Sequence, residues 1–232
     1  MLNQKIFFKH HLGMGDAIVH NGMVRKYLKD HPATQIFIPS KFHNLKNVIY
    51  MYRDCPSISV LGFSGDKGME NYLKVAKFDK IISTHYSDNN PFDYDKYCDD
   101  LFYHIIEMSP AVKKTHFFVQ RDSHIEAKVY DELVGSKGII DYIFIHEKEE
   151  SSIVINRDKL LPKLPIVIAD SKYGIFELLK VIEMSKRVDL VSSSFLSLMT
   201  CKKYNERVFA HMYCDRKNLA SYIIQQNIEV FL

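Results

Sequence analysis

The chain has 232 residues, of which 47% are hydrophobic and 25% charged, a balance typical of a globular protein and not of a disordered one. Its formal net charge of +3 suits an anionic small molecule, whereas a nucleic-acid-binding protein usually carries a denser basic stripe. The sequence contains no run of 18 apolar residues, and the first apolar stretch is short. We therefore expect neither a transmembrane helix nor a signal peptide.

The four cysteines, Cys55, Cys98, Cys201 and Cys214, show no CxxC spacing and no repeated interval. A disulfide framework is unusual in a chain of this length, and a zinc site would need a recognisable ligand spacing. We therefore expect reduced thiols in a cytoplasmic protein, with no structural metal.

Apolar runs of strand length alternate with segments of helical periodicity in the first half of the chain. We expect strands at 5–11, 35–40, 57–63 and 80–85, and helices at 16–29, 44–52, 69–76 and 95–108. This alternation is typical of a parallel sheet with helices on both faces.

The same alternation begins again after a Pro-containing segment at 109–115, the best candidate for a hinge. We expect strands at 116–122, 141–147, 165–170, 188–193 and 207–211, and helices at 124–134, 175–186, 195–203 and 216–226; 152–157 fits a strand or an extended loop. The sequence thus predicts an α/β fold of two small Rossmann-like domains, 1–112 and 113–232, facing each other across a cleft. One continuous doubly wound sheet is the alternative.

Ligands of open α/β sheets bind beyond the carboxyl ends of the strands, where loops lead into the next helices. The loops in these positions are 10–16, 84–88, 120–126, 146–152 and 192–194. For each loop taken alone, a structural role is the stronger interpretation. Histidines and charged residues gather at these strand ends, however, and this coincidence makes the loops the candidate site segments.

The first of these loops contains Gly13, Gly15 and Asp16 in the sequence GMGD. It lacks the third glycine of a dinucleotide fingerprint and the G-K-[ST] of a P-loop, so it is a tight turn that lets the backbone approach a ligand closely. Asp16 is either a cap of the following helix, worth roughly 1 kcal/mol, or a general base. A base at a helix start has to be partly desolvated, because the helix amides otherwise lower its pKa.

Ser192, Ser193 and Ser194 follow a buried strand and precede an apolar helix. Free N–H groups at such a helix start, with hydroxyls beside them, can bind a diphosphate, although serine is also a common cap. Arg121 could bind phosphate bidentately and Glu126 could bind sugar hydroxyls, or the two could form an ordinary surface ion pair.

His11 and His146 are expected at the ends of strands. The adjacent side chains of His10 and His11 point to opposite faces of a strand, which makes them poor partners in chelation. We therefore expect no metal site here.

These segments, in this order, resemble the GT-B glycosyltransferases. Residues 12–32, LGMGDAIVHNGMVRKYLKDHP, are similar to the strand end, G-D turn and Pro-terminated helix of the heptosyltransferase type. Residues 175–199 are similar to that type's donor segment, a strand ending in ADLVV followed by D-[ST]-G-x-x-H. The Arg121–Glu126 segment and SSSF resemble fucosyltransferase-type proteins, in which an arginine at a strand end binds the diphosphate of a GDP-sugar.

The resemblance implies a metal-independent glycosyltransferase without a cofactor. It would move a hexosyl, heptosyl or fucosyl group from a nucleotide diphosphate sugar to a hydroxyl of a carbohydrate acceptor. The first domain would be the acceptor side, with Asp16 as the base and His11, Gly13 and Gly15 in its loop. The second domain would bind the donor through Arg121, Glu126, His146, Glu177, Ser192, Ser193 and Ser194.

Three positions differ from the family's pattern, because Ser192 stands in place of Asp, Ser194 in place of Gly and Ser197 in place of His. These differences favour the alternative of a non-catalytic nucleotide-sugar binding module. A structural interaction domain is a further alternative, indicated by the 14 Tyr and 15 Phe, but core aromatic residues in a chain without tryptophan account for them more simply.

Overall fold

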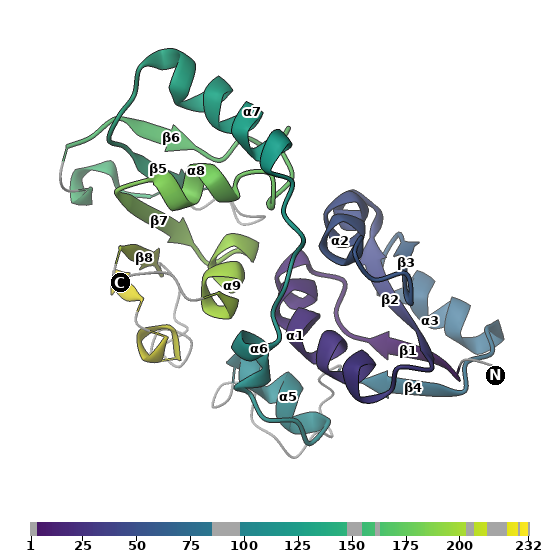
Figure 1. Cartoon of the computed structure of the whole chain (residues 1–232). Helices are drawn as coiled ribbons and strands as arrows, with labels where there is room; N and C mark the ends of the chain where they lie inside the picture. The colour runs from purple at the N-terminus through teal and green to yellow at the C-terminus, as the bar shows by residue number, and fades with distance from the viewer. Residues whose placement is uncertain are drawn as a thin grey trace. The chain divides into compact units, whose positions relative to one another are not determined.

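The computed structural model describes residues 4–84, 98–147, 155–160, 163–202, 207–212, 222–226 and 228–231. The chain forms two compact units, Met1–Gln120 and Arg121–Leu232. Each unit contains one sheet whose strands all pair in parallel (Figure 1). The alternation of strands and helices expected from the sequence is confirmed.

The sheet of the first unit has the order β3-β2-β1-β4. Its strands are β1 (Gln4–Lys9), β2 (Thr34–Lys41), β3 (Ile58–Phe63) and β4 (Lys80–Ser83). Its described helices are α1 (Met14–Asp30), α2 (Leu45–Tyr52), α3 (Asp66–Val75), α5 (Leu101–Ile105) and α6 (Val112–Thr115). Short 3-10 turns at Phe42–Asn44 and Cys98–Asp100 precede α2 and α5.

The core of the first unit forms around β1, a strand with neighbours on both sides. Ile6, Phe7 and Phe8 are each at most 1% exposed, because both faces of the strand are covered. In α1, every residue from 17 to 24 is buried. The N-terminal half of α1, where the loop after β1 enters the helix, is therefore held firmly against the sheet.

The boundary between the two units falls after Gln120, later than the expected boundary after residue 112. Residues 113–120 belong to the first unit because α6 packs on α1 at Gly22, where a Cβ would come 2.5 Å from the carbonyl oxygen of Val112. Beyond α6, the backbone N–H of Phe118 donates to Asn21 Oδ1 at 2.9 Å. Residues 117–122 form no strand, so the strand expected at 116–122 was wrong.

The sheet of the second unit has the order β6-β5-β7-β8-β9. Its strands are β5 (Ile143–His146), β6 (Ile166–Ile168), β7 (Arg187–Val191), β8 (Val208–His211) and β9 (Glu229–Phe231). Its described helices of six or more residues are α7 (Ser123–Leu133), α8 (Leu179–Met184) and α9 (Ser194–Cys201). All five residues of β7 are buried, as expected for a central strand.

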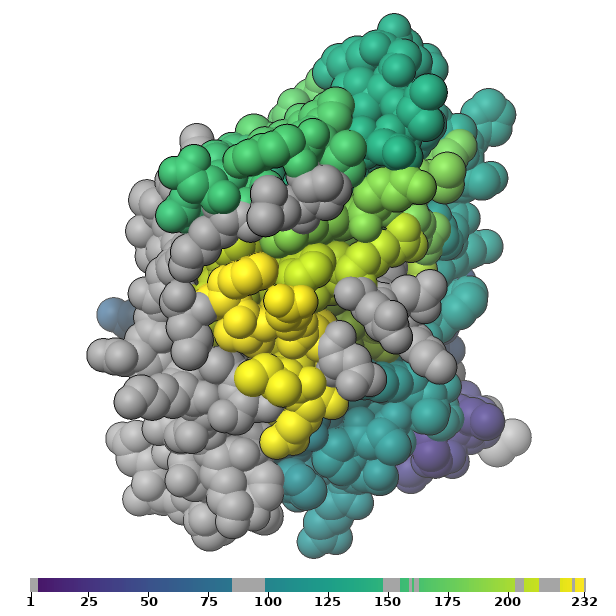
Figure 2. Space-filling view, turned by 90° about the vertical axis from the view of Figure 1, so that its left-hand side faces the viewer, coloured from purple at the N-terminus to yellow at the C-terminus, as the bar shows by residue number. Residues whose placement is uncertain are grey.

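Several expected elements differ in extent. Residues 175–178 form turns, so the helix expected at 175–186 is reduced to α8. The helix expected at 95–108 ends at Ile105, and Glu107 adopts a positive φ of 57°. The edge strand β9 was not predicted; the described residues at the C-terminal end of the chain, which include β9, are yellow in Figure 2.

Parts of several expected segments lie outside the described residues. These are 85–88, 148–152 and most of 216–226, together with Cys214. Within the described ranges, Cys55 and Cys201 form no disulfide bond. Among the described helices, none is both long and apolar enough to span a membrane.

Candidate functional site

The topology of each sheet indicates where a ligand would bind. In the first sheet the strand order reverses between β1 and β4, and in the second it reverses between β5 and β7. Open parallel sheets bind ligands beyond the carboxyl ends of the strands at such a switch point. Asp16 follows β1, whereas His146 ends β5 and Ser193 follows β7. The candidate residues of both units therefore lie at switch points.

Asp16 lies in the first turn of α1, whose N-cap is Gly13. Asp16 is thus not the N-cap residue itself. Its carboxyl group folds back over the turn toward Gly13: a Cβ added at Gly13 would come 2.7 Å from Asp16 Oδ2. The glycine at this position therefore leaves room for the carboxylate, and Gly15 lies beside it in the same helical turn.

Burial raises the pKa of Asp16 to about 7, and the negative charges of Asp99 and Asp66 contribute in the same direction. Lys41, at the end of β2, opposes this shift. The helix dipole favours the carboxylate form at a helix start, but here the cost of desolvation is larger. A carboxyl group with a pKa near the operating pH is suited to general base catalysis.

Behind the Asp16 turn lies His20, a buried histidine that joins α1 to the end of β4. His20 Nδ1 lies 2.6 Å from the carbonyl oxygen of Asp16, and His20 Nε2 lies 2.6 Å from Thr84 Oγ1. Because a carbonyl oxygen only accepts, Nδ1 carries the proton and the Thr84 hydroxyl donates to Nε2. Burial lowers the pKa of His20 well below its usual range, so the ring is neutral. This arrangement fixes the backbone from which the Asp16 side chain projects.

His10 stacks on His20, with the ring centroids 4.7 Å apart. Its Nδ1 donates to the carbonyl oxygen of His11, and burial lowers its pKa to about 4. The Nε2 atom of His10 is buried and has no hydrogen-bond partner among the described residues. His11 is half-buried at the same turn.

The switch point of the second unit contains two buried polar atoms without a hydrogen-bond partner in the described part of the chain. They are His146 Nδ1, at the end of β5, and Ser193 Oγ, at the N-cap of α9. The His146 ring packs against Phe195 in the first turn of α9, with the ring centroids 4.5 Å apart. Burial lowers the pKa of His146 to about 4. Buried polar groups are normally paired, so two unpaired atoms beside one helix start indicate a place where a polar ligand can bind.

Ser192 and Ser194 flank Ser193 and are half-buried. The first turn of any helix leaves N–H groups without an intrahelical acceptor, and α9 presents these groups beside the three hydroxyls. A helix N-terminus carries a partial positive charge that favours a phosphate. This helix start therefore has the groups that an anion site would need.

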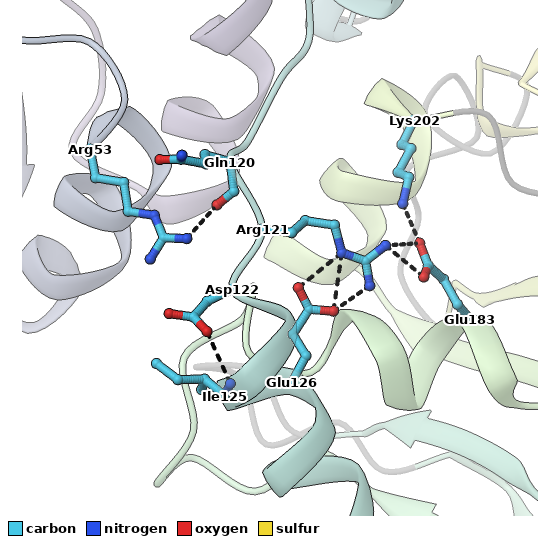
Figure 3. Close-up of polar contacts among 8 residues, drawn as sticks. All are labelled: Arg53, Gln120, Arg121, Asp122, Ile125, Glu126, Glu183 and Lys202. Carbon is cyan, nitrogen blue, oxygen red and sulfur yellow. Dashed lines mark hydrogen bonds and ion pairs between the residues drawn. The ribbon is translucent and has the colours of Figure 1, made fainter.

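Arg121 is not free to bind a phosphate in this structure. Its Nε lies 2.9 Å from Glu126 Oε1, and its Nη1 lies 2.7 Å from Glu183 Oε2 (Figure 3). Glu183 also binds Lys202, and Glu126 is only 2% exposed. The guanidinium thus links α7 to the end of α8. Of the two roles considered for Arg121 from the sequence, phosphate binding or an ion pair with Glu126, its contacts in the structure are those of the ion pair. For a role in donor binding, Arg121 would have to give up part of these contacts.

Glu177 lies in the turns before α8 and is buried, with its Oε2 accepting from the Gly174 N–H at 2.8 Å. It is therefore not on an exposed helix face. Beside His146, the buried carboxylate of Glu147 accepts two hydrogen bonds of 2.7 Å from Arg157. The described residues contain no group of three or more His, Cys, Asp or Glu side chains arranged to hold a metal ion.

Some residues of these sites were not singled out from the sequence. His20 stands four residues after Asp16, a spacing that places both on one helix face, and this was the available signal. Thr84 and His10 lie within the expected site loops, but their roles depend on packing between β1, β4 and α1.

No family model and no curated protein matches the sequence. Among solved structures, the chain is similar to a glycosyltransferase of family 9 from Veillonella parvula, with a TM-score of 0.57 and 10% identity, covering 91% of this chain and 81% of that one. Lower TM-scores relate it to the E. coli heptosyltransferase WaaC with ADP (0.45, 9% identity, 96% of both chains) and to the E. coli glycosyltransferase TibC (0.44, 10% identity, 99% of this chain and 58% of that one). The likeness to the family 9 structure confirms the expected GT-B-like α/β fold of two Rossmann-like units.

Proposed function

We propose that this chain transfers a sugar from a nucleotide diphosphate sugar to a hydroxyl group of a carbohydrate acceptor. The observation that carries the proposal is the Asp16 carboxyl group, which is desolvated at the switch point of the first unit and has a pKa of about 7. Glycosyl transfer to a hydroxyl needs a base that removes the hydroxyl proton as the new bond forms. An exposed aspartate with an ordinary pKa of 3.8 would be a much weaker base.

In this proposal Asp16 accepts the proton of the acceptor hydroxyl, and the hydroxyl oxygen attacks the anomeric carbon of the donor. The bond between that carbon and the diphosphate oxygen breaks, and the nucleoside diphosphate leaves with the bonding electron pair. His20 holds the carbonyl of Asp16 and keeps the helix turn in place during the step. Gly13 provides the space that the carboxylate occupies.

The donor diphosphate would bind at the start of α9, near Ser192, Ser193 and Ser194. Backbone N–H groups and hydroxyls that are already oriented stabilise the charge that develops on the leaving group without having to reorganise. The proposed reaction needs no metal ion, because this helix start and the residues around it supply the electrostatic stabilisation. A heptosyl, hexosyl or fucosyl donor is compatible with this chemistry.

A non-catalytic nucleotide-sugar binding module is the second candidate. The observation that favours it is the set of serines at 192, 194 and 197, where the resembling family has Asp, Gly and His. Such a module would bind the nucleotide at α9 but would have no use for the raised pKa of Asp16.

Calorimetry with ADP, GDP and UDP, followed by an assay of nucleoside diphosphate release from the matching nucleotide sugars, separates the two candidates. We expect binding of one nucleotide and release of that nucleotide from its sugar, with release abolished and binding retained in Asp16→Asn. Binding without release in the presence of an acceptor panel would favour the binding module. Absence of binding by all three nucleotides would refute both.

A further inference from the structure

The arginines in the described part of the second unit are all engaged by other protein groups. Arg121 binds Glu126 and Glu183, and Arg157 binds Glu147. Arg187 binds Asp189, and Arg207 donates to the carbonyl oxygens of Ser185 and Glu183. Each of these guanidinium groups is therefore already paired with an acceptor of the protein itself.

His146 differs from these arginines, because its Nδ1 is buried without a partner among the described residues. It lies at the end of β5, next to β7, and its ring packs on Phe195 in the first turn of α9. The second unpaired buried atom, Ser193 Oγ, stands at the N-cap of the same helix. A ligand at this helix start would thus meet a hydroxyl, free helix amides and an imidazole nitrogen.

We infer that His146 takes up a proton when a nucleoside diphosphate binds at the start of α9, and so becomes the cation that neutralises the leaving group. This inference rests on the proposed function, since it assigns the counter-ion of the same site. The proton comes from water, and it returns to water when the nucleotide leaves.

The electrostatic surroundings of His146 support this inference. Burial is the cause of its low pKa of about 4, so the free site holds a neutral ring. Directly after β5, the adjacent carboxylate of Glu147 is neutralised by Arg157. On β7, Leu190 is the register partner of His146, so Asp189 projects to the opposite face, where it binds Arg187 and His211. Residues 194–201 of α9 carry no charged side chain.

A bound diphosphate strongly shifts the equilibrium between the neutral and the protonated ring of His146 toward the protonated form. One full negative charge about 4 Å from the ring, at an effective dielectric of about 20, favours the protonated imidazole by a factor of roughly 1,000. That factor moves the pKa of His146 from about 4 to about 7, and a second charge on the diphosphate moves it further. The free protein is therefore neutral at this point, and the complex is charged.

The test is an NMR titration of the histidine ring signals between pH 4 and pH 9, without ligand and with ADP, GDP or UDP. Contacts between the rings of His146 and Phe195 identify the signal, so the measurement does not depend on a variant folding. We expect the pKa of His146 to rise from about 4 to 7 or above with the nucleotide that binds. Sulfate, which does not titrate in this range, serves as a second anion and should shift the signal in the same direction.

Two variants give an independent readout by calorimetry between pH 7 and pH 8.5. If the second phosphate charge raises the pKa of His146 in the complex to about 8, His146→Gln should weaken nucleotide binding at pH 7 about ten-fold and remove the loss of affinity that deprotonation of the ring causes between pH 7 and pH 8.5. His124→Gln, at an exposed position on α7, is the matched control and should behave like the wild-type protein.

Each outcome separates this inference from the proposed function. Nucleotide binding with an unshifted His146 signal, or with full affinity in His146→Gln, would overturn the inference and leave glycosyl transfer untouched. A shifted signal in a protein that transfers no sugar would support the inference and refute the proposed function. If no nucleotide and no sulfate binds, the anion site itself is refuted.

Discussion

Replacing Asp16 by Asn should make the first unit more stable at alkaline pH. The carboxyl group has a pKa of about 7 in the folded chain against 3.8 for an ordinary aspartate. Between these values the folded state holds more protons than the unfolded state, so wild-type stability falls as the pH rises through this window. The full penalty, reached above pH 7, is about 4 kcal/mol. Asn carries no charge and avoids it.

One effect of Asp16→Asn opposes this stabilisation, and it is smaller. An ionised Asp16 interacts favourably with the N-terminal end of α1, and Asn gives up this interaction, which is typically worth about 0.3 to 1 kcal/mol. Desolvation therefore decides the sign. The stability difference between Asp16→Asn and the wild-type protein should grow by about 3 kcal/mol between pH 5 and pH 8.

Urea denaturation at pH 5 and at pH 8 measures this difference. The unfolding transition of the first unit, which contains α1, is the one to be monitored. The control is Asp79→Asn, which removes an exposed carboxylate just before β4, keeps an oxygen that can accept from the Lys5 N–H, and should gain less than about 1 kcal/mol over the same interval. If the Asp16→Asn difference is the same at pH 5 and pH 8, Asp16 is an ordinary solvated carboxylate and the reasoning about its basicity is refuted.

Two further substitutions test the contacts around the sites. Arg121→Ala should lower the free energy of unfolding of the second unit by about 2 kcal/mol, because Glu126 stays buried without its guanidinium partner. Thermal denaturation measures this loss. A loss below about 0.5 kcal/mol would contradict the ion-pair assignment. Thr84→Val should destabilise the first unit by about 1 to 2 kcal/mol, because His20 Nε2 loses its hydrogen-bond donor. Thr84→Ser keeps the hydroxyl and should stay close to the wild-type stability. Equal losses in both variants would exclude the hydrogen bond as the cause.

The strands and the location of the first site could be predicted because they depend on local patterns. Apolar runs such as 35–40 and 141–147 alternate with helical segments, and this pattern specifies parallel strands with crossover helices. The glycine before Asp16 and the helix after it indicated a tight turn at a strand end, where the structure places it. Strand order was not visible in the sequence, and it is strand order that defines the switch points.

Interactions between distant residues explain what the sequence did not reveal. The segment HFFVQ has the composition of a strand, but its backbone is held by Asn21, 97 residues away, and pairs with no strand. Arg121 resembled a phosphate ligand because its second carboxylate partner, Glu183, is 62 residues distant. His146 became a specific candidate only when the buried, unpaired Nδ1 and the neighbouring Phe195 were known.

The pH dependence of nucleoside diphosphate release from a nucleotide sugar, measured with an acceptor for wild-type protein and Asp16→Asn, tests the central claim most directly. We predict that the wild-type rate rises with pH through an apparent pKa of about 7, since the ionised form of Asp16 is the active base, and that Asp16→Asn shows no transfer at any pH while it still binds the nucleotide. Transfer by Asp16→Asn at the wild-type rate, with the same pH profile, would contradict the assignment of Asp16 as the base.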